Sequence, residues 1–426
     1  MKLLRVIAGL LALSSASVAS AQSLAIVHAK AWTGDGQAAI EDATIVVRDG
    51  RIVSVGRGGP PSGVQVIDAA GRPVTPGLFA GATQLGLMEL SDAADTSDVA
   101  ISSGKLGAAF DISTALNPNS LPVEQARADG VVWALSFPSG SANAPFLGQA
   151  ALLKLQDGQI LERARAAMFV KIGGGAASKV GGSRAAAWTL LRCALDEARQ
   201  LRAGHLAAAD DRLFPEIDLE ALRPVIDGAM PLAIQTDRQS DIAEAIRLKQ
   251  DYQLKLVLVG AAEAWTLADQ IARAGVPVVM DPGADLPISY DALGARLDNA
   301  AILDRAGVTL GVTLTANVID MNYTAGLSSR VAAGLAVAHG LPYASAIRAL
   351  TLGPAIIWGT SDRAGAIAPG KSADLVIWDG DPLEPSSSPA AVIVGGRRVS
   401  TDTRQEQLAK RYAPTRTDKT WPPAYR

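Results

Sequence analysis

Apolar runs typical of buried strands alternate with helix-patterned segments through the middle of the chain, from about residue 74 to residue 362. The strand-like runs are 131–137, 167–172, 232–235, 254–259, 276–280 and 308–314. The helix-like segments include 185–201, 240–252, 262–274 and 328–339. Strands that are apolar on both faces and separated by helices indicate a parallel sheet covered by helices. The length fits a closed barrel, so we predict an α/β fold with a TIM-like (β/α)8 barrel over residues 74–362.

Both ends of the chain are strand-rich. Near the start, residues 43–48 and 51–55 are joined by Asp49-Gly50, a strong two-residue hairpin signal. Near the end, 373–378 and 391–394 have the same strand character. We therefore predict one small β-sandwich domain built from both ends. Its N-terminal part is 22–73, its C-terminal part is 363–402, and a surface tail follows at 403–426.

The first residues have the pattern of a signal peptide. Lys2 and Arg5 precede an apolar stretch at 6–13, and small residues lead up to Ala21. The apolar stretch is shorter than the roughly 20 residues that span a bilayer, and no such run follows it. We expect a signal peptide at 1–21 that is cleaved near Ala21, leaving a periplasmic or secreted protein without a membrane span.

Composition excludes several classes of protein. The 39 Lys and Arg residues are outnumbered by 42 Asp and Glu, and aromatic residues make up only 4% of the chain. Neither bulk positive charge nor an aromatic stacking platform is available for nucleic acid. The single cysteine, Cys193, forbids an internal disulfide and lies in a helix-patterned segment, which favours a core thiol.

Four motifs at the two ends carry a resemblance to a known family. They are Ile-Glu-Asp-Ala-Thr-Ile-Val-Val-Arg-Asp-Gly-Arg-Ile-Val-Ser-Val-Gly at 40–56, Val-Ile-Asp-Ala-Ala-Gly-Arg-Pro-Val-Thr-Pro-Gly-Leu at 66–78, Ala-Leu-Thr-Leu-Gly-Pro-Ala at 349–355, and Gly-Ala-Ile-Ala-Pro-Gly-Lys-Ser-Ala-Asp-Leu-Val-Ile-Trp-Asp-Gly-Asp-Pro at 365–382. Together with the barrel between two β ends, the chain resembles the amidohydrolase superfamily, especially its imidazolonepropionase-like and dipeptidase-like branches. The resemblance implies a hydrolase acting on carbon-nitrogen bonds in non-peptide or cyclic amides.

The same resemblance implies one or two divalent metals at the carboxyl ends of the barrel strands. The family's ligands are a His-x-His on strand one, often a carboxylated Lys on strand four, His on strands five and six, and Asp on strand eight. Here residues 80–84 read Ala-Gly-Ala-Thr-Gln, and Gln235 or Asp237 stands at strand five. Gly260 stands at strand six and Leu314 or Thr315 at strand eight, so only Lys171 matches the pattern.

The chain has three histidines in all, His28, His205 and His339. None follows a predicted barrel strand, and we expect surface or helix-capping positions for them. The usual His-ligated zinc site is therefore not supported, and no cofactor is predicted. A site for Mg²⁺ or Ca²⁺ made of oxygen ligands stays open.

Polar residues at the predicted strand ends are the candidates for a ligand site. They are Gln84, Lys171, Gln235, Asp237, Arg238 and Glu263, with Asp281 after strand seven and Asn317 or Asp320 after strand eight. Lys171 and Asp237 are the candidates for proton transfer. A lysine in an apolar strand needs an anion partner, a lowered pKa or carboxylation, and a structural salt bridge to Asp237 is the alternative. Gln84 and Gln235 could instead simply fill the volume of lost histidines.

A glycine-rich segment, 173–184, follows a strand and precedes a helix. It lacks the spacing of a phosphate-binding loop, so we expect a loop over the barrel mouth with Ser183 as the helix N-cap.

Two functions remain. The chain is either an exported C–N hydrolase with a rebuilt site, or a catalytically inactive ligand-binding protein or partner subunit of an active amidohydrolase. The expected partner is a small molecule, and oligomerisation is left open.

Overall fold

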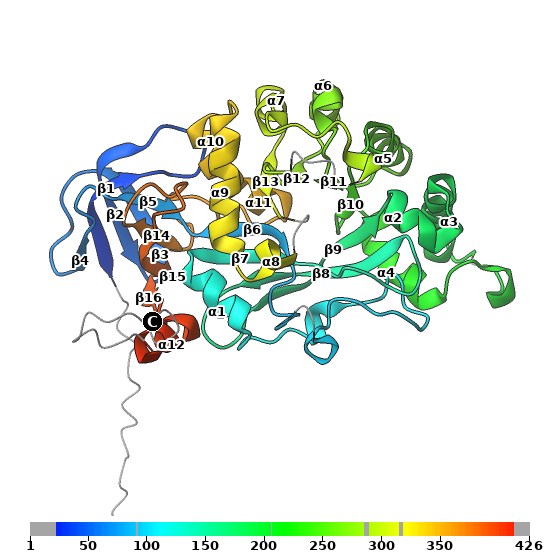
Figure 1. Cartoon of the computed structure of the whole chain (residues 1–426), viewed down its shortest axis with the longest axis horizontal. Coiled ribbons are helices and arrows are strands. Elements are labelled where there is room, and N and C mark those ends of the chain that lie inside the picture. Colours follow the sequence, from blue (N-terminus) through cyan, green and yellow to red (C-terminus); the bar gives the residue numbers. More distant parts are fainter. Residues whose placement is uncertain (1–22, 91–92, 206, 285–288, 315–317, 413–426) are drawn as a thin grey trace, which may run out of the picture.

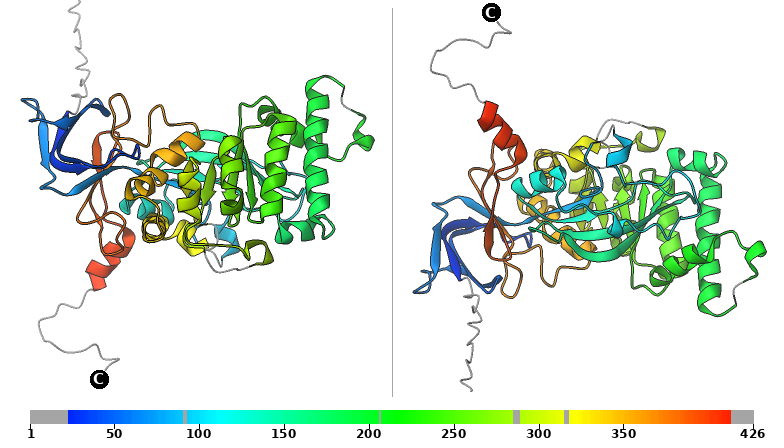
Figure 2. Two further views of the ribbon diagram at one scale, coloured as in Figure 1. Left: turned by 90° about the horizontal axis from the view of Figure 1, so that it is seen from above. Right: turned by 90° about the horizontal axis from the view of Figure 1, so that it is seen from below.

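The structure is a computed structural model, and it describes residues 23–90, 93–205, 207–284, 289–314 and 318–412. Two eight-stranded sheets organise the chain. The sheet built from the chain ends lies at one end of an elongated molecule, the second sheet occupies the middle, and helices α3 (Arg184–Arg202) and α4 (Glu216–Ile226) lie at the far end (Figures 1 and 2).

The first sheet joins both ends of the chain. Its strands are β1 (Leu24–Ala31), β2 (Ile40–Arg48), β3 (Arg51–Arg57), β4 (Gln65–Asp68), β5 (Pro73–Pro76), β14 (Leu375–Trp378), β15 (Pro389–Val394) and β16 (Arg397–Val399). They follow the order β16-β15-β14-β5-β1-β2-β3, with β4 paired to β1. The antiparallel pair β5 and β14 connects the two ends, with Val376 opposite Thr75. The predicted strands at both ends therefore exist and share one sheet, whereas their arrangement as a sandwich stays a prediction.

The predicted hairpin is confirmed as β2 and β3. Both turn residues have positive φ, 53° at Asp49 and 72° at Gly50. This conformation matches the twist of the flanking strands and explains why Asp-Gly is favoured there. A Cβ at position 50 would also stand 2.8 Å from the carbonyl oxygen of Gly395, so the close approach of the C-terminal segment requires glycine.

The second sheet is a nearly closed barrel. Its strands are β6 (Leu78–Thr83), β7 (Val131–Ser136), β8 (Phe146–Lys154), β9 (Leu161–Lys171), β10 (Leu232–Thr236), β11 (Leu256–Gly260), β12 (Val278–Met280) and β13 (Leu310–Val312). The first and last strands meet closely: the Thr313 hydroxyl donates to the Ala82 carbonyl oxygen at 2.7 Å. A Cβ on Gly81 would stand 2.5 Å from the Val312 carbonyl oxygen.

The barrel departs from the predicted regular alternation at β8. This strand runs antiparallel to both β7 and β9, whereas the remaining pairs in the sheet are parallel. The connections on either side of β8, residues 137–145 and 155–160, are too short to hold a crossover helix. The prediction of a uniform (β/α)8 barrel was therefore wrong over residues 137–171, where the chain forms a meander of three strands.

The helices around the barrel broadly follow the sequence pattern. The remaining α-helices are α1 (Leu121–Ala128), α2 (Gly174–Ala177), α5 (Gln239–Tyr252), α6 (Ala268–Arg273), α7 (Asn299–Arg305), α8 (Val318–Asn322), α9 (Ala325–Ala338), α10 (Tyr343–Ala349), α11 (Leu352–Ile357) and α12 (Arg404–Tyr412). The segment predicted as one helix at 262–274 divides into a 3₁₀ turn at 264–267 and α6. In the described part of the chain, no helix combines the length and hydropathy that membrane crossing requires.

Asp374 fastens the end sheet to the barrel. Its carboxylate accepts hydrogen bonds from Trp133 Nε1 at 2.9 Å and from the Gly395 amide at 2.7 Å. Lys154 Nζ lies 3.2 Å from the same carboxylate, and only 5% of the Asp374 side chain is exposed. Because a buried carboxylate is stable only when its oxygens are satisfied, these three partners fix how β14 sits against β7 and β8.

Candidate functional site

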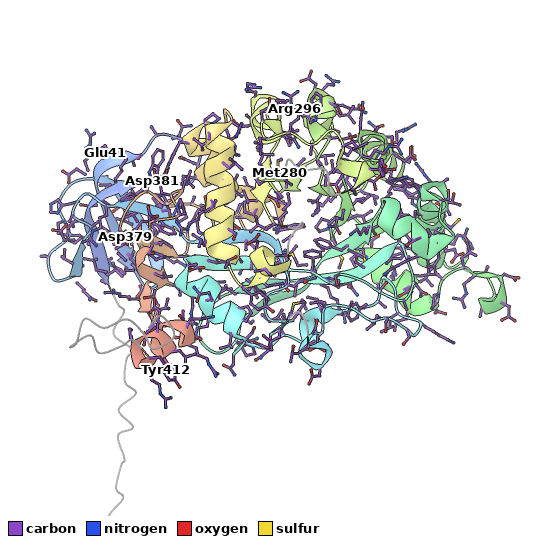
Figure 3. The ribbon with its side chains drawn as sticks, in the orientation of Figure 1. Glu41, Met280, Arg296, Asp379, Asp381 and Tyr412 are labelled. Atoms are coloured by element: carbon purple, nitrogen blue, oxygen red, sulfur yellow. The ribbon has the colours of Figure 1, made fainter. Side chains whose placement is uncertain are left out.

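The carboxyl ends of β9 to β12 surround a cavity of about 660 Å³, which we call the mouth cavity. The residues that line it are Lys171, Ile172, Gly173, Gly174, Gly175, Arg184, Gln235, Thr236, Asp237, Gly260, Ala262, Met280, Asp281, Gly283, Ala284, Ser289, Tyr290, Asp291, Ala292, Ala295, Arg296 and Asn299. Met280 and Arg296, labelled in Figure 3, mark its β12 side and the segment before α7. Because the strands are parallel here, their carboxyl ends bring together side chains that are far apart in the sequence.

Asp281, directly after β12, is the most perturbed carboxyl group of this cavity. Burial raises its pKa to about 6, and the negative charge of Asp320 acts in the same direction. The Gly283 amide donates to Oδ1 at 3.0 Å and opposes the shift. A carboxyl group with a pKa near 6 is half ionised close to neutral pH, which suits it to accept a proton.

Asp237, directly after β10, has a similar environment. Burial raises its pKa, while the hydrogen bond from Ala262 and the charge of Lys171 lower it. The Ala262 amide lies 3.3 Å from Oδ1. Gly260 has φ +85°, and a Cβ there would stand 2.6 Å from the same oxygen. Position 260, which aligns with a family histidine, therefore has a backbone conformation and surroundings that favour glycine in this chain.

Lys171 ends β9 and faces the mouth cavity, next to Gln235 in the neighbouring strand. Its side chain is exposed, because the strand's apolar burial stops one residue earlier, at Val170. No ion pair joins Lys171 to Asp237, although its charge lowers the pKa of that carboxyl group. The alternative of a structural salt bridge between these two residues is thus not realised.

Two residues that line the mouth cavity, Asp291 and Arg184, were not predicted from the sequence, and their contacts connect the segments around its opening. Asp291 accepts a hydrogen bond from the Gly174 amide at 2.6 Å and forms a short ion pair with Arg184. Arg184 also lies 3.5 Å from Asp241, whose other oxygen accepts from Trp188. Asp291 lies in a short 3₁₀ turn, Tyr290–Ala292, which leaves no strand or long helix pattern in the sequence to place it. Only the predicted loop at 173–184 pointed to this region.

The remaining predicted candidates lie outside the lining of the mouth cavity. Gln84 is buried, and its backbone amide donates to Asn322 Oδ1 at 3.1 Å. Glu263 accepts hydrogen bonds from the Gln239 amide at the start of α5 and from the Gly294 amide. Its side chain therefore connects two backbone segments.

Four further residues were named from the sequence, three as site candidates and Ser183 as a helix N-cap. Arg238 is the exposed N-cap residue of α5, and Asp320 accepts hydrogen bonds from Thr324 and Ser328. Asn317 lies outside the described residues. Ser183 stands at the N-cap of α3 as expected, but its side chain makes no capping hydrogen bond.

The three histidines lie away from the mouth cavity and are exposed. His28 in β1 is 3.0 Å from Asp68, and His339 follows α9. Within the described ranges, no three His, Cys, Asp or Glu side chains converge as metal ligands. The donor set therefore does not fit the His-ligated zinc that the family resemblance implies, and no chemistry is derived through such a metal.

Aromatic side chains fill the inside of the barrel beneath the mouth. Phe137 stacks on Phe169 with ring centroids 4.7 Å apart, and Phe169 stacks on Trp358 at 6.1 Å. Trp358 Nε1 donates to the carbonyl oxygen of Gly81, in the segment where the family carries His-x-His. All three rings are at most 3% exposed. Small residues on β6 leave volume that these rings occupy.

A model of the amidohydrolase family matches residues 163–399, which is more than half of the chain. The chain therefore belongs to the amidohydrolase family, whose class is hydrolysis of carbon-nitrogen bonds. A stretch of 58 residues, 14% of the chain, is 41% identical to the amidohydrolase tasK of Hapsidospora irregularis. This match spans only 6% of that relative's length.

Solved structures agree on the fold. An amidohydrolase from Thermotoga maritima superimposes with a TM-score of 0.78 at 22% identity, covering 88% of this chain and 99% of the other. A putative prolidase from Bifidobacterium longum gives a TM-score of 0.52 at 17% identity, with 89% and 95% covered. Molinate hydrolase gives 0.54 at 18% identity, also with 89% and 95% covered. These similarities establish the fold alone.

Proposed function

We propose that this protein is an exported member of the amidohydrolase family that binds a small amide with oppositely charged ends in the mouth cavity, without a His-ligated metal. The observation that carries the proposal is the composition of the cavity lining. It presents an exposed ammonium group, Lys171, together with two carboxyl groups, Asp237 and Asp281. Such a lining complements a carboxylate at one end of a ligand and an amino group at the other.

The size and polarity of the cavity support a small ligand. Its volume of about 660 Å³ lies within the range of typical small-molecule sites, roughly 300–1,000 Å³. Alanine and glycine residues and Met280 form much of the wall, so a few charged groups set the orientation of the ligand. Dipeptides and amino-acid amides have this combination of charges.

Calorimetric titration of the mature chain with a panel of dipeptides and cyclic amides tests the proposal. We expect saturable binding of zwitterionic members, weakened about tenfold or more in Lys171→Met, since a charge-assisted contact is worth about 1.5–3 kcal/mol. Lys105→Met removes an exposed lysine outside the cavity lining and is the matched control. Binding that is unchanged in Lys171→Met, or absent across the panel, would refute the proposal.

Hydrolysis of the bound C–N bond is the second candidate, and the raised pKa of Asp281 favours it. Ionised Asp281 would take a proton from water as the water oxygen attacks the carbonyl carbon. Asp281 would then pass that proton to the departing nitrogen, so that the C–N bond breaks, a carboxylic acid and an amine are released, and the carboxylate is restored. The rate should rise with an apparent pKa near 6 and be lost in Asp281→Asn. Binding without turnover at any pH would leave the chain a ligand-binding protein.

Export is proposed from the N-terminal pattern, which lies outside the described residues. N-terminal sequencing of the protein recovered from a periplasmic or culture fraction should begin at Gln22. Recovery with Met1 intact in the cytosolic fraction would contradict export.

A further inference from the structure

A second cavity of about 640 Å³ opens at the opposite end of the barrel, among the amino ends of β9 to β13; we call it the base cavity. The residues that line it are Arg163, Arg165, Ala166, Ala229, Pro231, Lys249, Leu254, Lys255, Leu256, Val257, Ala272, Gly275, Val276, Pro277, Gly307, Val308, Thr309, Ile356, Ile357, Trp358 and Gly359. None of the lining residues is shared with the mouth cavity. A ligand here would therefore be independent of the proposed function.

The charges of this lining have one sign. Arg163, Arg165, Lys249 and Lys255 contribute to it, and no aspartate or glutamate occurs among the described residues that line it. Arg165 is paired with Asp111 at 2.9 Å. The other three form no ion pair with any residue in the described part of the chain. In a chain whose formal charge is −3, this is a local excess of positive charge.

Arg163 lies close to another cation, Arg363. Burial lowers the pKa of its guanidinium, and the nearby charge of Arg363 lowers it further. The charges of Glu162 and Asp362 act in the opposite direction, but Glu162 is paired with Arg363 at 2.7 Å, so the repulsion between Arg163 and Arg363 is only partly offset. An anion in the cavity would relieve this repulsion.

The walls between the cations are apolar. Val257 lies in β11, Val276 and Val308 lie just before β12 and β13, and Ile357 and Trp358 come from the end of α11. A site that combines several cations with an apolar wall favours an anion carrying an apolar body over a bare inorganic ion. We propose that the base cavity binds an organic carboxylate or sulfonate with a flat apolar body.

Helix ends offer a different explanation for the same cations. Lys249 Nζ donates to the Leu254 carbonyl oxygen at 3.4 Å after α5, and Arg163 donates to the Trp358 carbonyl oxygen after α11. Basic side chains near helix C-termini stabilise those ends. Each contact uses one donor, however, and Lys255 has no such contact among the described residues.

Titration with 8-anilinonaphthalene-1-sulfonate at low ionic strength separates the two explanations. This probe is an aromatic sulfonate whose fluorescence rises in apolar surroundings. We expect saturable binding that weakens with salt, and whose Kd rises about tenfold or more in the double variant Lys249→Gln/Lys255→Gln. The matched control Lys30→Gln/Lys105→Gln removes the same charge outside the cavity and should leave the Kd unchanged.

Three results would overturn the proposal. One is an unchanged Kd in Lys249→Gln/Lys255→Gln together with a lowered melting temperature, the outcome that helix stabilisation predicts. Another is a Kd that changes in Lys171→Met instead, which would place the probe in the mouth cavity. Fluorescence that does not saturate would likewise reject a defined site.

Discussion

Asp281→Asn should stabilise the protein at neutral pH. In the folded state burial raises the pKa of Asp281 to about 6, from an ordinary value of 3.8. Below pH 3.8 the group is protonated in both states and contributes nothing. As pH rises towards 6, the unfolded chain loses the proton while the folded chain keeps it, so the folded state loses stability. Above pH 6 the loss is complete.

The size of the effect follows from the pKa difference. At 1.36 kcal/mol per pKa unit, the change from 3.8 to about 6 corresponds to about 3 kcal/mol of destabilisation at pH 7. Asparagine keeps an oxygen that can accept from the Gly283 amide but carries no charge. We therefore expect the free energy of unfolding of Asp281→Asn to exceed that of the wild type by up to about 3 kcal/mol at pH 7.

Urea unfolding at pH 4, 5.5 and 7.5 measures this difference. The advantage of Asp281→Asn should be small at pH 4, below about 1 kcal/mol, and grow with pH. Asp298→Asn is the control of opposite sign, since the ion pair with Arg296 lowers the pKa of Asp298. If the advantage of Asp281→Asn were the same at all three pH values, or if the variant were destabilised at pH 7.5, the reasoning about burial would be refuted.

Three further predictions concern other contacts. Gly260→Ala should lower the free energy of unfolding by about 1–3 kcal/mol in urea melts, because it strains a positive φ and crowds Asp237; an unchanged melt would contradict this. Asp374→Ala should cost about 3–5 kcal/mol by the same measurement, because Trp133 and Lys154 lose their partner, and a cost near zero would deny the fastening role. Lys171→Met should leave the melting temperature unchanged within about 2 °C, since the side chain is exposed; a large fall would make the lysine structural.

The sequence was sufficient for the larger features of the fold. Apolar runs and the Asp49-Gly50 turn predicted most strands of both sheets, because burial and turn geometry leave local patterns. The antiparallel strand β8 was missed. Its apolar residues at 146–154 resemble those of a parallel strand, and only the short connections on either side indicate that it runs antiparallel.

The mouth cavity was predictable only in part. Lys171 and Gln235 lie in the last residues of their strands and Asp237 and Asp281 directly follow theirs; all four line the cavity and were named as candidates from that position. Glu263 had the same signal but is turned towards the backbone amides of Gln239 and Gly294. Which way a side chain turns after a strand depends on tertiary partners that a single sequence does not reveal.

The central claim is that this chain keeps the amidohydrolase fold while its mouth cavity binds a ligand without a His-ligated metal. Its most direct test is the zinc content of the purified mature chain, measured by inductively coupled plasma mass spectrometry after incubation with excess zinc and dialysis. We expect far less than one zinc ion per chain. Retention of one or more zinc ions per chain would contradict it.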